Sequence, residues 1–222
     1  MTDTNNLIDQ LAARAMPVKR IASPLQRTLL WVALAAGIVL AFVLKHGARA
    51  GWLHTLADPG TAIEWFASVL TGVLAAYALF QISVPGRSRS WIWLPLPFAI
   101  FWLMGIGMGC MHDFAQMGGS AFAYESTSSE CAWAIVMASL PLGLVLLLMV
   151  RHAGVVCPGR AAMLAALSAA AFASAGVSLF HKGETALMSL LWHVGAVVLL
   201  SGLSWLSGRQ LFAWIGYTRR SA

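Results

Sequence analysis

The sequence predicts an all-α, polytopic membrane protein, a bundle of six transmembrane helices with a short amphipathic N-terminal cytoplasmic helix. Of the 222 residues, 59% are hydrophobic and 10% are charged, and the mean hydropathy is +0.77. Soluble domains carry about 25% charged residues. Six apolar runs approach the roughly 20 residues that a helix needs to cross a bilayer. Because lipid offers no partners for backbone N–H and C=O groups, these runs should be helices.

The apolar runs divide the chain into three parts. We expect a cytoplasmic head at residues 1–27, a transmembrane domain at 28–206 and a cytoplasmic tail at 207–222. The fifth run is dominated by Ala, Ser and Gly, whose small side chains let helices approach closely, so this span should lie at the centre of the bundle. The six expected spans are 28–45, 62–83, 91–110, 131–150, 161–180 and 186–206.

The prolines of the third and fourth runs should affect their helices. Pro95 and Pro97 lie early in the third run, and Pro141 lies within the fourth. Because proline lacks an N–H and its ring crowds the preceding turn, we expect kinks or local loosening at these positions.

The basic residues predict the orientation. With the amino terminus inside, the inner segments hold 11 Lys and Arg residues and the outer segments hold 3. This excess follows the positive-inside rule and predicts that both termini lie in the cytoplasm. The short loops and compact spans are typical of a bacterial inner-membrane protein. The net charge of +6 then reflects membrane topology, so a nucleic-acid partner is not expected. The polar first 27 residues do not resemble a cleavable signal peptide.

The head contains a short amphipathic helix. Leu7, Ile8 and Leu11 form an apolar stripe at helical spacing, and Pro17 limits the helix to about a dozen residues. An isolated helix of this length is marginal in water. It therefore needs a protein partner or the membrane surface, and its periodicity does not distinguish the two.

The expected spans contain very few ionisable residues. Apart from Lys45, which ends the first span, they are Glu64 and His193, and both lie near the outer end of a span. Ion-coupled transporters usually need such groups near the midplane, so a transporter is not expected. The sequence also contains no hydrolase, kinase or nucleotide-binding fingerprint.

The outer surface carries the side chains best suited to bind a metal ion or to undergo oxidation. Cys110 ends the third span, Cys131 begins the fourth, and His112 and His181 occupy the outer loops. Together with His193 they provide thiolate and imidazole groups, the ligands that copper, zinc or cadmium prefer. A Cys110–Cys131 disulfide is a second interpretation, and small packing cysteines with ordinary loop histidines are a third.

Three stretches carry a resemblance to a known family. They are NLIDQLAARAMPVKRIASPLQR before the first span, CAWAIVMASLPLGLVLLLMVRHAGVVCPGRAAMLAAL in the fourth and fifth, and LFHKGETALMSLLWHVG before the last. The sequence resembles the NrsF family of bacterial six-span membrane anti-sigma factors. The resemblance implies a protein that holds an ECF-type sigma factor at the inner membrane and releases it under heavy-metal or oxidative stress.

The resemblance also implies roles for particular residues. Family members carry two sensing cysteines, and Cys131 matches the first, whereas His181 occupies the second position. A disulfide between those positions is thereby excluded, while a Cys131–His181 metal site stays open, and Cys110 could substitute as a redox partner. The candidates for binding the sigma factor are Leu7, Ile8, Leu11, Pro17, Lys19 and Arg20.

We therefore expect a regulator and not an enzyme, with no fixed cofactor beyond a soft metal ion at the periplasmic face. The alternative is a membrane thiol-redox enzyme or metal-handling protein that uses Cys110 and Cys131. Such enzymes usually carry a Cys-x-x-Cys pair, which this chain lacks. A structural subunit of a larger membrane complex is a further alternative.

Overall fold

The computed structural model describes most of the 222-residue chain, namely residues 2–13, 21–47, 51–52, 57, 59–122, 128–151, 153, 155–180, 187 and 190–216. Every regular element in these ranges is helical, which confirms the all-α fold class. The α-helices are α1 (Thr2–Ala13), α2 (Pro24–His46), α4 (Pro59–Ile82), α5 (Leu96–Met117), α6 (Ser128–Val150), α7 (Pro158–Val177), α9 (Gly195–Leu206) and α10 (Gly208–Trp214). Two 3₁₀ helices, η1 (Arg89–Trp93) and η2 (Gly118–Phe122), flank α5, and a π turn, η3 (Leu190–Val194), precedes α9.

Several helices are suited to a bilayer. Five are long and apolar enough to cross one, and α9 with its π turn joins α10 as a further pair that is bent by 72°. The chain is thus compatible with a multi-pass membrane protein, and the count reaches six when the bent pair is taken as one span. The five helices are Pro24–His46, Pro59–Ile82, Arg89–Ser120, Ala132–Val150 and Pro158–Val177.

The first long helix begins earlier than the sequence predicts. It starts at Pro24 and not near residue 28, because Ser23 and Gln26 form a capping box. The backbone N–H of Gln26 donates to Ser23 Oγ at 3.3 Å, and the backbone N–H of Ser23 donates to Gln26 Oε1 at 3.2 Å. These bonds satisfy backbone donors at the helix start, and Pro24 has no N–H to satisfy. Arg27 consequently belongs to α2.

The prolines act differently from one another. Pro95 is the N-cap residue of α5 and Pro97 lies in its first turn, so both mark a boundary with η1 where a proline costs no helical hydrogen bond. They do not kink the interior of α5. Pro141 lies inside α6, which continues from Ser128 to Val150.

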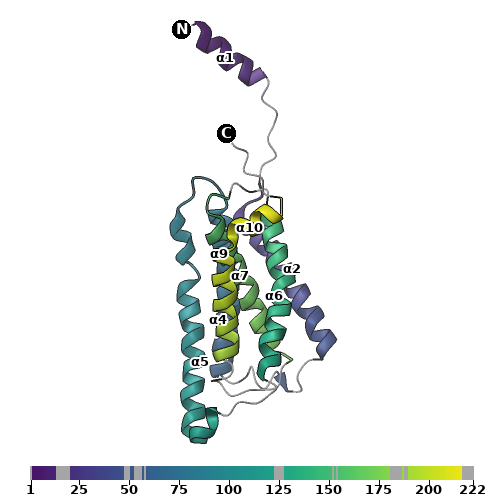
Figure 1. The fold of residues 1–222 in the computed structure, drawn as a ribbon, viewed down its shortest axis with the longest axis vertical. Coiled ribbons are helices and arrows are strands. Elements are labelled where there is room, and N and C mark those ends of the chain that lie inside the picture. Colours follow the sequence, from purple (N-terminus) through teal and green to yellow (C-terminus); the bar gives the residue numbers. More distant parts are fainter. Residues whose placement is uncertain are drawn as a thin grey trace.

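Helix α7 is the centre of the bundle, as its small residues predict. Fourteen of its 20 residues are buried, and it contacts α2, α4, α6, α9 and α10 (Figure 1). The approach is close, because a Cβ on Gly72 of α4 would lie 2.8 Å from the Phe172 ring. A Cβ on Gly176 would lie 2.8 Å from Val39 of α2.

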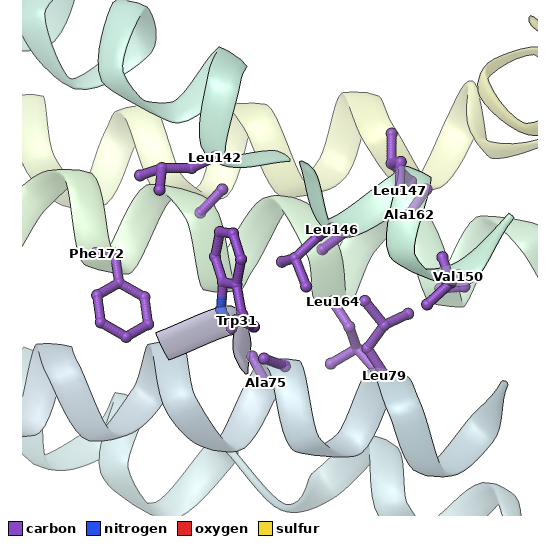
Figure 2. Packing of buried hydrophobic residues seen from close by; sticks show 14 of the residues in the cluster. Trp31, Ala75, Leu79, Leu142, Leu146, Leu147, Val150, Ala162, Leu164 and Phe172 are labelled. Atoms are coloured by element: carbon purple, nitrogen blue, oxygen red, sulfur yellow. The ribbon is translucent and has the colours of Figure 1, made fainter. Parts of the chain in front are cut away.

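One serine joins three helices in this centre. Ser168 of α7 donates to the Gly72 carbonyl of α4 at 2.7 Å and accepts from the Trp31 indole of α2 at 3.1 Å. Figure 2 shows Trp31 between the α4 and α7 ribbons, with Ala75 and Leu79 on one side and Leu142 and Leu146 on the other. Trp31 is fully buried, so its N–H depends on Ser168.

The bend between α9 and α10 has a steric basis. A Cβ on Gly208, the first residue of α10, would lie 2.5 Å from Gly159 Cα and 2.7 Å from Gly159 N. A Cβ on Gly159 would lie 2.8 Å from the Trp205 carbonyl oxygen. Two glycines therefore let α10 cross the beginning of α7 with the backbones in contact.

This crossing yields a stability prediction. Gly208→Ala should lower the free energy of unfolding by about 1–3 kcal/mol, because its methyl group meets backbone atoms that cannot rotate away. Gly202→Ala in α9 is the matched control: a Cβ there meets nothing within 4 Å, and alanine favours helix. Thermal unfolding in detergent micelles compares the two, and equal midpoints would contradict the close packing.

Candidate functional surfaces

The head presents its apolar stripe to solvent. In α1 the side chains of Leu7, Ile8 and Leu11 are 56%, 56% and 63% exposed. Residues 4–13 are all exposed, and α1 lies apart from the bundle in Figure 1. The amphipathic helix predicted for the head is therefore present, and its apolar face is exposed with respect to the described part of the chain. The other three candidates, Pro17, Lys19 and Arg20, lie outside the described residues.

One end of the bundle gathers the described arginines. Arg27 lies in the first turn of α2, Arg87 and Arg89 follow α4, Arg151 follows α6, Arg160 begins α7, and Arg209 lies in α10. Arg27 contacts Ser83 after α4 and Met149 near the end of α6, and Gly159 contacts Gly208, so these segments meet. We call this the arginine end. It lies beside α10 in Figure 1, and the head is attached there through α2.

Arg27 is buried at the arginine end, although an arginine at the edge of an apolar run is usually solvated. Its guanidinium donates to the Met149 carbonyl and, at 3.4 Å, to Ser83 Oγ, and it lies 4.4 Å from the centroid of the Phe80 ring. Charge-assisted hydrogen bonds and a cation–π contact compensate its lost hydration. Arg27 thereby joins the beginning of α2 to α4 and α6. From the sequence, Arg27 is expected at the end of the cytoplasmic head at residues 1–27, since nothing in its sequence neighbourhood indicates burial.

The opposite end carries Cys110. Its thiol is free and half-buried, on α5, and packs beside an apolar cluster that includes Trp102. Glu64 of α4 and Asp113 of α5 both lie near Cys110. A Cβ on Gly105 would lie 3.4 Å from Glu64 Cβ, so α4 and α5 approach closely here. We call this the cysteine end.

The two described histidine candidates differ in their surroundings. His193 is buried in the π turn, where its Nδ1 lies 2.6 Å from Ser174 Oγ of α7. His112 is exposed on α5. Within the described ranges no three His, Cys, Asp or Glu side chains form a metal-binding group. In that part of the chain, Cys110, His112 and His193 are thus not assembled into one metal centre.

The predicted Cys131–His181 site is untested. The backbone of Cys131 lies in the first turn of α6, but its side chain is outside the described residues, as is all of His181. The metal site and the Cys110–Cys131 disulfide therefore stay predictions.

The fold and its surfaces define a class of protein: a helical protein whose long apolar helices are compatible with several membrane spans and whose described N-terminal helix exposes an apolar stripe. The chain belongs to the NrsF family, described as negative regulator of sigma F, whose match covers residues 11–214. No curated protein and no solved structure matches the chain.

Family membership confirms the resemblance seen in the sequence and sets the coarse function. The protein is a negative regulator whose partner is a sigma factor, and the family is defined by regulation, not by catalysis. The match begins at Leu11, so Leu7 and Ile8 precede it, while Pro17, Lys19 and Arg20 lie inside it.

The buried arginine yields a second stability prediction. Arg27→Ala should lower the free energy of unfolding by about 1.5–3 kcal/mol, because it removes charge-assisted hydrogen bonds and leaves the Met149 carbonyl without this donor. Arg209→Ala removes an exposed arginine from the same end and should change stability by less than about 0.5 kcal/mol. Chemical denaturation of the two variants in micelles measures the difference, and equal stabilities would refute a structural role for Arg27.

Proposed function

We propose that the protein is a membrane-bound anti-sigma factor. It sequesters an ECF-type sigma factor at the cytoplasmic face of the bacterial inner membrane and releases it under heavy-metal or oxidative stress sensed at the periplasmic face. The observation that carries this proposal is the exposed apolar stripe of α1 in a chain of the sigma F regulator family. A regulator of this kind needs a surface that competes with core RNA polymerase, and α1 offers one.

The proposed topology follows from the two ends of the bundle. The bent pair α9–α10 counts as the sixth span, and the arginine end faces the cytoplasm, where basic loops are retained. Both termini then lie inside, together with the head. The cysteine end faces the periplasm, an oxidising compartment that also meets external metal ions first.

Binding is proposed to use the helix-in-groove mode. Leu7, Ile8 and Leu11 would enter an apolar groove of the sigma factor, and full burial of each contributes about 1.5–3 kcal/mol. The isolated helix has marginal stability, so the conformational entropy lost when it becomes ordered is compensated by binding. Lys19 and Arg20 would meet acidic groups of the partner and guide the encounter.

Release is proposed to start at Cys131 and His181. A copper, zinc or cadmium ion held by the Cys131 thiolate and the His181 imidazole, or oxidation of Cys131 with Cys110 as partner, would favour a second arrangement of the bundle. The signal works only through a difference in sigma-factor affinity between the two arrangements. The change would reach the head through two sets of contacts. Helix α7 contacts five other helices, and Arg27 joins α2 to α4 and α6.

The head-binding step has a direct test. In Leu7→Asp, Leu11→Asp protein, two charges replace the apolar stripe, and the sigma factor that co-purifies with the full-length chain should fall about tenfold or more. Asn6→Asp, Ala13→Asp adds the same two charges to the opposite face of α1 and should retain the parental amount. Retention of the sigma factor by the first variant would refute binding through α1.

The sensing step is tested with a reporter gene that depends on the sigma factor. Cys131→Ser and His181→Ala should each blunt its response to added cadmium or zinc, because each removes one proposed ligand. Cys157→Ser, at the arginine end, is the cysteine control and should respond like the parent. An unchanged dose response in both site variants would reject this sensor and leave head binding intact.

A further inference from the structure

A cavity of about 270 Å³ opens at the arginine end. Its walls come from the segment that follows α4, from η1, and from the segment that leads into α7. Arg87, Arg89 and Arg160 line it together with apolar side chains, among them Ile82 and Ile92. The cavity thus combines three guanidinium groups with an apolar base, although the three arginines belong to segments up to about 70 residues apart in the chain.

The three arginines have exposed side chains, and none of the residues that line the cavity is acidic. Among the described residues no carboxylate pairs with Arg87, Arg89 or Arg160, whereas the guanidinium of Arg27 donates to Ser83 and Met149. Guanidinium groups bind phosphate oxygens in paired hydrogen bonds. Helix α7 also begins at this cavity, and its N-cap residue Cys157 makes no side-chain capping bond, so the partial positive charge of the helix start adds to the field.

The cavity lies beside an aromatic membrane anchor. Trp91 and Trp93 belong to η1, which forms one wall. The Trp91 ring packs edge-on against the Tyr77 ring of α4, with 5.7 Å between the two ring centroids, while the Trp93 side chain is 67% exposed. Tryptophan rings at helix ends settle at the level of lipid headgroups. In a bilayer, such an anchor would hold the arginines of the cavity at the depth where lipid phosphates lie.

We propose that this cavity is a phosphate site that binds the headgroup of an anionic membrane lipid such as phosphatidylglycerol. The three arginines bind the phosphate, and Ile82 and Ile92 contact the glycerol and the first methylene groups. An occupied site would tie the segment after α4 to the start of α7, next to the place where α10 crosses α7. This lipid site is independent of the sigma factor and of the proposed sensor.

The test uses purified full-length protein in a neutral detergent, titrated with short-chain phosphatidylglycerol and followed by native mass spectrometry. Arg87→Gln, Arg160→Gln should weaken binding by about tenfold or more, since each arginine near a membrane surface contributes about a fivefold factor in affinity. The matched control is Arg151→Gln, Arg209→Gln, which removes two charges from the same end but outside the cavity. Its affinity should stay within about twofold of the parent. Circular dichroism of both variants verifies that they are folded, and Arg160→Gln alone should weaken binding by about fivefold.

Further arms identify the ligand. Phosphatidylcholine of the same chain length should bind at least about tenfold more weakly than phosphatidylglycerol, because its choline cancels the net charge. Inorganic phosphate at millimolar concentration should displace the lipid weakly; binding of phosphate as tight as that of the lipid would keep the phosphate site but assign it to a free anion. Equal lipid affinities of the two double variants would overturn the proposal. Loss of the sigma factor from the cavity variant with lipid binding unchanged would also overturn it and would assign the cavity to the protein partner.

Discussion

The close approach of backbones along α7 is the constraint on which the rest of the bundle depends. In a bilayer, an apolar side chain gains little free energy when it moves from lipid into a helix interface. Membrane helices therefore associate through dense packing and hydrogen bonds. The small residues of α7 permit both. Gly72 and Gly176 remove the side chains that would separate α7 from α4 and α2, and the Ser168 hydroxyl then reaches a carbonyl and an indole on two neighbours. A larger side chain at these contacts would separate several helix pairs at once.

The two ends of the bundle are built from different interactions. At the arginine end, a buried cation holds α2, α4 and α6 together, and two glycines bring α10 onto α7. At the cysteine end, α4 and α5 meet at Glu64 and Gly105, and His193 is held by Ser174. Both ends therefore contact α7 or its direct neighbours, which gives the protein a continuous packed path between its two candidate functional surfaces.

Much of this architecture could be predicted from the sequence. Apolar length and composition located the long helices, and the small residues of the fifth run placed it at the centre, because both properties belong to single segments. The burial of Arg27, the hydrogen bonds of Ser168 and the bend between α9 and α10 could not be predicted. They depend on which helix meets which, and hydropathy carries no information about such pairings. The head helix was predicted together with its apolar stripe, whereas the Cys131–His181 site remains a prediction, based on the ligand chemistry of these residues and on the family resemblance.

The geometry of α9 and α10 also limits how the last helix can move. Helix α9 is followed by α10, which is bent from it by 72° and contacts the start of α7 through Gly208 and Gly159. If α9 moved along its axis toward the cysteine end, α10 would collide with the start of α7. The contact between Gly208 and Gly159 therefore opposes such a displacement.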